Sequence, residues 1–183
     1  MKSLLVSGYR SHELGIFSQN DEKYKIIHAF LTRELIQCIE NDYEWIVSAG
    51  QSGIELWAIE VALELKEYFP NLKVAMLPPF HENQENWSDD RKEKYELLTF
   101  EVDHFQYISD KPYEAPWQLR NKNIFLTSRT QGLFLLYDEE KEGSPKFLYE
   151  EAKKKRENGD YEIFSRDFQD MQDFYQQVLD AME

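Results

Sequence analysis

One segment of small residues constrains the fold of this chain more than any other: Ser48-Ala-Gly-Gln-Ser-Gly-Ile-Glu55. It follows a short apolar run, Trp45–Val47, and precedes a helical pattern over residues 56–69. Glycines allow positive φ angles and let the backbone approach a ligand closely. A strand, a glycine-rich turn and a helix in this order aim backbone N–H groups and the positive helix end at one point. The segment therefore predicts an anion-binding loop.

Apolar runs and helical patterns alternate along the rest of the chain. Five strands are predicted at residues 4–6, 45–48, 74–77, 105–108 and 133–137, with a short strand or extended segment at 161–164. Helices are predicted at residues 21–42, 56–69, 88–102, 116–129, 144–158 and from Ser165 onward. Strands separated by helices form parallel βαβ units, and continuous apolar strands are covered by helices on both faces. We therefore expect one domain over residues 1–183, a three-layer Rossmann-like α/β fold with a mostly parallel sheet of about five strands flanked by helices.

The charge balance disfavours several kinds of partner. The chain has 21 basic and 35 acidic residues, a net charge of −14, which repels nucleic-acid backbones and anionic lipid surfaces. It shows no secretory signal and no run of the ~20 apolar residues that a membrane helix needs. The single cysteine, Cys38, lies in an apolar helical stripe, and the four histidines lack metal-ligand spacing. We expect a cytoplasmic protein with a buried thiol, no metal, and no nucleic-acid or membrane partner.

Ligands of open α/β sheets bind beyond the carboxyl ends of the strands. Five loops are expected at that edge: Gly8–Arg10, Gly50–Glu55, Pro79–Trp87, Asp110–Arg120 and Asp138–Gly143. Their aromatic residues offer surfaces on which a base could stack, namely Tyr9, Trp87, Tyr113 and Trp117. Arg10 and Arg120 could pair with phosphates. Each has a structural alternative: packing for the aromatic rings, a surface ion pair for Arg10, and a loop cap for Asp138.

Glu55 allows two interpretations. In the first turn of a helix a carboxylate gains ~0.3–1 kcal/mol from the helix dipole without touching a ligand. If Glu55 faces the ligand instead, it repels phosphate, so a sugar hydroxyl or a scissile glycosidic bond suits it better. In the second case it either holds the sugar or serves as a general acid or base.

Three segments together resemble one family: the first strand with Gly8-Tyr9-Arg10, the segment 48–55, and Trp117-Gln-Leu-Arg120-Asn121. The chain is similar over essentially its whole length to the YpsA family of the SLOG superfamily, which also holds the LOG phosphoribohydrolases and the DprA Rossmann domain. The resemblance implies a Rossmann-like fold and a nucleotide-derived ligand, ADP-ribose or NAD-related, and points to no certain cofactor. It also implies a link to bacterial cell division or stress.

These observations predict one ligand site and three functions. The predicted ligand-binding residues are Gly8, Tyr9, Arg10, Gly50, Gln51, Ser52, Gly53, Glu55, Trp117, Arg120, Asn121 and Asp138. The first hypothesis is a regulator or sensor whose ligand-bound state a protein partner reads. The second is a hydrolase or transferase that acts on an N-glycosidic bond with Glu55 as the catalytic acid or base. The third is a protein-interaction module without a ligand. The regulator is favoured, because only Glu55 is well placed for catalysis.

Overall fold

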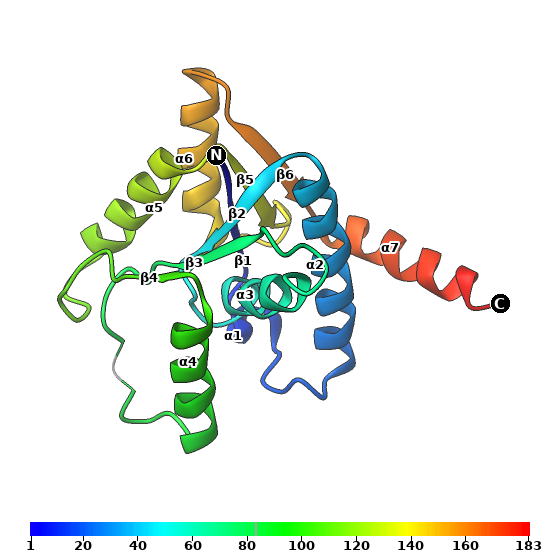
Figure 1. Cartoon of the computed structure of the whole chain (residues 1–183), viewed down its shortest axis with the longest axis horizontal. Helices are drawn as coiled ribbons and strands as arrows, with labels where there is room; N and C mark the ends of the chain where they lie inside the picture. The colour runs from blue at the N-terminus through cyan, green and yellow to red at the C-terminus, as the bar shows by residue number, and fades with distance from the viewer. Residues whose placement is uncertain (83) are drawn as a thin grey trace.

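The computed structural model describes residues 1–82 and 84–183, which form a central parallel sheet with helices on both faces (Figure 1). The strands lie in the order β4-β3-β2-β1-β5-β6 and are β1 (Lys2–Gly8), β2 (Tyr43–Ser48), β3 (Lys73–Met76), β4 (His104–Phe105), β5 (Gly132–Leu136) and β6 (Glu162–Arg166). The helices are α1 (Ser11–Leu14), α2 (Glu22–Glu40), α3 (Ile54–Leu65), α4 (Asp89–Glu101), α5 (Trp117–Arg129), α6 (Pro145–Glu157) and α7 (Phe168–Ala181). The predicted three-layer α/β class is confirmed.

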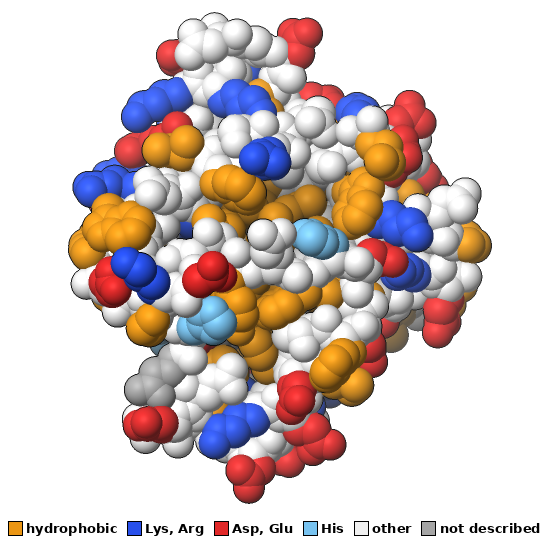
Figure 2. Space-filling model, turned by 60° about the vertical axis from the view of Figure 1, so that its left-hand side comes forward, with side chains coloured by type: hydrophobic (Ala, Val, Ile, Leu, Met, Phe, Trp, Pro, Cys, Tyr) orange, Lys and Arg blue, Asp and Glu red, His pale blue; other side chains and the backbone are white. Residues whose placement is uncertain are grey.

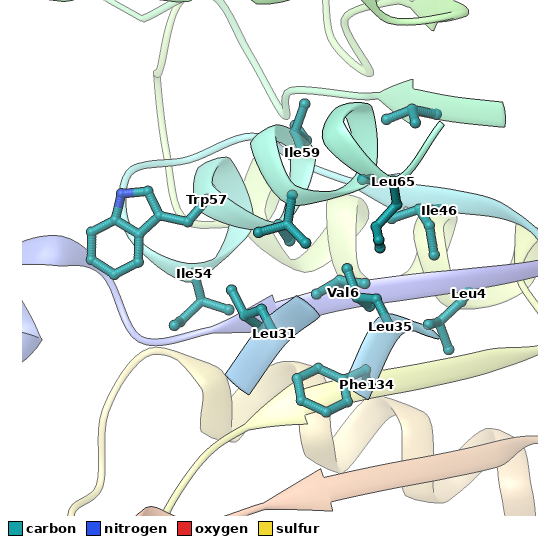
Figure 3. Packing of buried hydrophobic residues seen from close by; sticks show 14 of the residues in the cluster. Leu4, Val6, Leu31, Leu35, Ile46, Ile54, Trp57, Ile59, Leu65 and Phe134 are labelled. Atoms are coloured by element: carbon teal, nitrogen blue, oxygen red, sulfur yellow. The ribbon is translucent and has the colours of Figure 1, made fainter. Parts of the chain in front are cut away.

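Two apolar cores lie on opposite faces of the sheet, because successive side chains of a strand point to opposite sides. Leu4 and Val6 of β1 join the larger core with residues from α2, α3 and α7, and Figure 3 shows the packing of β1 against α2 and α3. Leu5, between them, joins the second core beneath α5 and α6. The strands therefore read as continuous apolar runs, as the sequence indicated.

The sheet has six strands rather than about five. Residues 162–166 pair in parallel with β5 over its whole length. The segment predicted at 161–164 as either a short strand or an extended stretch is therefore an edge strand. The last helix does not open at Ser165, which lies in β6. It opens at Phe168, where the Asp167 carboxylate accepts a hydrogen bond from the Asp170 amide. The C-terminal half of α7 projects away from the body (Figure 1), and Val178 in this half is 39% exposed.

The strand order creates a switch point beside β1. The chain moves outward from β1 through β2 and β3 to β4, and then returns to place β5 on the other side of β1. The loops that follow β1 and β5 therefore leave the sheet in opposite directions. In open α/β sheets this divergence produces a crevice at the carboxyl edge, and the candidate site lies there.

Candidate functional site

A cavity of about 330 Å³ lies at the carboxyl ends of β1 and β2, between the start of α3 and helices α5 and α6. Five of the predicted residues line it: Gly8, Arg10, Gln51, Glu55 and Arg120. Other lining residues with polar or exposed side chains were not predicted, namely Ser7, Lys122, Asn123, Ser144 and Phe147. The structure therefore joins the first strand, the glycine loop and the later Arg120 segment around one space.

The Glu55 carboxylate is buried, with 4% of the residue exposed, and both of its oxygens are held by the chain. Ser7 Oγ donates to Oε2 at 2.8 Å, and the Gln51 amide donates to Oε1 at 3.2 Å. Ser48 Oγ donates to the Glu55 carbonyl at 2.8 Å and accepts from the Gly50 amide at 3.1 Å. These bonds fix the carboxylate in the wall of the cavity. The carboxylate thus lines the cavity and also lies in the first turn of α3, so its position agrees with both interpretations of Glu55.

Gly53 determines how the glycine loop meets the loop after β1. It has a φ of 96° and a ψ of −139°, a conformation essentially confined to glycine. A Cβ at this position would meet the Tyr9 carbonyl oxygen and would lie 2.7 Å from the Ser11 amide nitrogen. The Ile54 amide donates to that same Tyr9 carbonyl at 3.1 Å. The start of α3 thus docks directly on residues 9–11, and this contact brings Arg10 to the cavity.

Several amides of the glycine loop already have acceptors within the chain. The Gly50 and Gln51 amides donate to Ser48 and Glu55, and the Ile54 and Leu56 amides donate to the carbonyls of Tyr9 and Gln51. These four amides of the expected cradle are therefore committed to holding the loop and the carboxylate. Side chains at the cavity add to the attraction that the remaining amides can offer an anion.

Two guanidinium groups supply that attraction, those of Arg10 and Arg120, and the amine of Lys122 lines the same cavity. Lys122 is only 7% exposed, and burial lowers the pKa of its amine, against the opposing effect of the Glu55 carboxylate. Two buried polar atoms at the cavity, Arg10 Nε and Asn123 Oδ1, have no hydrogen-bond partner among residues 1–82 and 84–183. Buried polar atoms are nearly always hydrogen-bonded in proteins, so these two mark groups with unused capacity for a ligand.

Several predicted residues lie outside this cavity. Tyr9 is completely buried: its ring stacks on Phe168 at a centroid distance of 5.4 Å and cannot stack on a base. Its hydroxyl donates to the Lys141 carbonyl at 2.6 Å, which ties the loop after β5 to β1. The Asp138 carboxylate accepts from the Glu140 amide at 2.9 Å, as expected of a loop cap. Asp138 lines a separate depression with residues of α7.

The remaining predicted contacts divide between α5 and neighbouring depressions. Asn121 and Trp117 are exposed on α5 and do not line the cavity, whereas Lys122 and Asn123 do. Ser52 lies in depressions on the other side of the glycine loop, one of which also contains Trp87. Asn83, in the predicted loop 79–87, lies outside the described residues.

A signal for Lys122 and Asn123 was present in the sequence. Leu119 and Leu126 are seven residues apart on α5, and positions 122 and 123 lie between them on the same helix face. Apolar residues are expected at such positions. A lysine and an asparagine at these positions indicate that part of the inner face of α5 lines a polar site.

Comparison with known proteins identifies the family. The profile of the YspA SLOG family (YpsA) matches residues 4–171. The chain belongs to this family. It is 43% identical over 164 residues to the UPF0398 protein YpsA of Bacillus subtilis, covering 90% of this chain and 91% of that one. It is 42% identical over 172 residues to a UPF0398 protein of Brevibacillus brevis, covering 94% and 92%.

Among solved structures, this YspA SLOG family chain is similar to DNA processing protein A of Helicobacter pylori. The sequence identity is 16% and the TM-score is 0.42, over 97% of this chain and 81% of the other. The Helicobacter pylori protein has a unique single-stranded DNA binding mode. In residues 1–82 and 84–183 of the present chain, no helix is long and apolar enough to cross a membrane.

Proposed function

We propose that this protein is a cytoplasmic regulator or sensor that binds a nucleotide-derived ligand, of the ADP-ribose or NAD type, in the cavity between α3, α5 and α6. One observation carries the proposal: a buried, fixed carboxylate and the guanidinium groups of Arg10 and Arg120 line the same space. A carboxylate accepts hydrogen bonds from ribose hydroxyls, and guanidinium groups pair with phosphate oxygens. A ribose phosphate combines both chemistries in one small molecule.

The size of the site supports a ligand larger than ribose phosphate. The cavity of about 330 Å³ lies at the lower end of the range for ligand pockets, roughly 300–1,000 Å³. A second depression of about 640 Å³ shares Arg10, Gln51 and Leu119 with it and is lined by Phe80 and Tyr113. These two rings offer an apolar surface for a base, while Arg10 lies where the two spaces meet and suits a bridging phosphate.

A basic nucleic-acid surface is not part of the proposal. The face shown in Figure 2 has acidic and basic side chains interspersed, with apolar groups in its hollows, rather than a continuous basic band. With a net charge of −14, the long-range field favours small anions that reach local cations over polyanions. The proposed output is a protein partner that reads the ligand-bound state, in cell division or stress.

Titration calorimetry with ADP-ribose, NAD and AMP tests the proposal. We expect Glu55→Gln to weaken binding about 10- to 100-fold, because a hydrogen bond to a charged group contributes ~1.5–3 kcal/mol. Glu67→Gln, at an exposed position just beyond α3, is the matched control and should bind as the unaltered protein does. Absence of binding for all three compounds at millimolar concentration would refute the proposal and leave an interaction module without a ligand.

The position of Glu55 also favours a second candidate, a hydrolase or transferase that acts on an N-glycosidic bond. A carboxylate that faces the sugar is placed to move a proton at the anomeric carbon or to stabilise positive charge there. Release of free base from a nucleotide, followed by chromatography and abolished by Glu55→Gln, would establish this activity. Binding without turnover would instead support the regulator.

A further inference from the structure

Lys122 is a nucleophile that the proposed binding does not need for charge. Arg10 and Arg120 already place two cations at the same cavity. Lys122 lines the cavity from the inner face of α5, and no hydrogen bond or ion pair within the described part of the chain occupies its amine. A buried amine that faces a ligand cavity and is not committed to the protein is available for chemistry.

The surroundings of Lys122 favour its neutral form. Burial lowers the pKa of the amine, and the nearby Arg10 guanidinium acts in the same direction, against the Glu55 carboxylate. Neutral amines, unlike ammonium ions, add to carbonyl carbons. Lys155 provides a contrast: burial also lowers the pKa of its amine, but that amine donates to the carbonyls of Thr127 and Thr130 and lies outside the cavity.

The other polar groups of the cavity match the needs of an addition to an aldehyde. Glu55 offers a carboxylate for proton transfer, and Asn123 Oδ1, which has no partner among the described residues, can accept a hydrogen bond from a hydroxyl of the adduct. Ser7 and the Gln51 amide hold the carboxylate in place. Amine, carboxylate and hydrogen-bond acceptor thus surround one space.

We propose that Lys122 forms a reversible imine with the aldehyde of an aldose phosphate, the ring-opened anomeric carbon of a ribose that carries no base. This proposal rests on the proposed function, because it places the ribose end of an ADP-ribose-type ligand in the same cavity. Under this proposal, only a ligand with a free anomeric carbon can be held covalently. NAD, whose anomeric carbons are both bonded to bases, would bind only non-covalently.

The reaction balances without an oxidant or a cofactor. The nitrogen lone pair of Lys122 attacks the anomeric carbon, a C–N bond forms, and a proton passes from nitrogen to the former carbonyl oxygen to give a carbinolamine. Protonation of that hydroxyl and cleavage of its C–O bond release water and leave a protonated imine. Glu55 is placed to relay these protons. Addition of water reverses every step and returns the aldehyde.

Reductive trapping tests the proposal on the unaltered protein. The protein is incubated with ADP-ribose, ribose 5-phosphate or NAD in the presence of cyanoborohydride, which reduces an imine to a stable secondary amine, and the modified lysines are mapped by mass spectrometry. We expect Lys122 to be labelled by the first two compounds roughly tenfold or more above exposed lysines, because the cavity holds the two reactants together. NAD should give no adduct, and Lys155 should remain unlabelled.

The outcomes separate this proposal from the proposed function. Calorimetric binding of ADP-ribose without an adduct at Lys122 overturns the imine and leaves ligand binding intact, and so does equal labelling of all exposed lysines. Absence of both binding and adduct overturns both proposals. Lys122→Arg should lose the adduct while Lys155→Arg keeps it, and Lys122→Met serves if the arginine variant does not fold.

Discussion

The close approach of Gly53 to residues 9–11 makes a quantitative prediction for Gly53→Ala. The φ of 96° and ψ of −139° lie in a region essentially confined to glycine, so an alanine there is strained by about 1–3 kcal/mol. Its Cβ would also lie 2.7 Å from the Ser11 nitrogen and 2.8 Å from the Arg10 carbonyl carbon. These are backbone atoms, so the loop itself must shift, at a cost of about 1–3 kcal/mol for an overpacked contact.

Alanine also reduces the freedom of the unfolded chain, which offsets about 0.4–1 kcal/mol of this cost. The net expectation for Gly53→Ala is a loss of about 1–5.5 kcal/mol in the free energy of unfolding. For a chain of 183 residues this corresponds to a fall in Tm of roughly 2–20 °C. Urea titration followed by far-UV circular dichroism measures the free energy directly. Ligand affinity should fall as well, because the shifted loop carries Arg10.

Two other glycines separate conformational strain from the clash. Gly15 has a φ of 68°, but apart from its chain neighbours no atom of the described residues lies within 4 Å of the position that a Cβ would take. Gly15→Ala should therefore cost only the strain of a left-handed alanine, about 1–2 kcal/mol, less the same offset of about 0.4–1 kcal/mol. Gly159 has no positive φ and, within the described part of the chain, no close neighbour, so Gly159→Ala should gain the offset alone, about 0.4–1 kcal/mol. If Gly53→Ala costs no more than Gly15→Ala, the docking of α3 on the loop after β1 is refuted.

Three further predictions concern titratable and reactive groups. The Tyr43 hydroxyl, which donates to the Glu162 carboxylate at 2.7 Å, holds the pKa of Glu162 below its usual range. A carboxylate whose pKa is lowered in the folded state stabilises the protein at pH values above its unfolded pKa of about 4.3. The free energy of unfolding lost in Tyr43→Phe at pH 7 should therefore shrink as the pH falls below about 4. Urea titrations at pH 7 and pH 3 measure this loss, and an equal loss at both pH values would contradict the prediction. Burial raises the pKa of the Cys38 thiol to about 12, so iodoacetamide at pH 8 should label Cys38 only after unfolding, and native labelling at the rate of a free thiol would show that the thiol is accessible. Lys122→Met removes a buried amine without a partner in the described part of the chain, so chemical denaturation should show a gain of about 1–3 kcal/mol, whereas a loss would mean that the amine supports the fold.

Local patterns predicted most of the fold because its signals lie within single elements. Ser88 shows this at α4, where its hydroxyl accepts from the Arg91 amide and begins the helix as the sequence indicated. The short edge strands were harder to predict. β4 has only two residues, and β6 is recognisable mainly through its pairing with β5, which depends on a partner distant in the sequence.

The sheet topology allowed the location of the site to be predicted, but not the directions of its side chains. The rule that ligands bind at the carboxyl edge placed Glu55 and Arg10 at one cavity without any knowledge of side-chain packing. The rule gives no direction for a side chain. Tyr9 turns beneath the loop after β5, and its hydroxyl meets residues 138 and 141, more than a hundred positions away in the sequence. Lys122 reaches the cavity because of how α5 packs across the sheet.

The chemistry of the ligand can be narrowed by comparing two buried polar side chains of α5. Gln118 uses its whole amide within the chain: its oxygen accepts from the amides of Glu114 and Ala115, and its nitrogen donates to the Pro112 carbonyl. Such burial stabilises a loop and needs no ligand.

Further along α5, Asn123 presents an oxygen with no partner among the described residues, and across the cavity Arg10 presents a buried Nε that also has no partner among them. The first requires a donor, such as a sugar hydroxyl, and the second an acceptor, such as a phosphate oxygen. A molecule that satisfies both atoms, and the Glu55 carboxylate as well, must carry hydroxyl donors and an anionic acceptor close together. A phosphorylated sugar meets this requirement, whereas a free base or a simple anion meets only part of it.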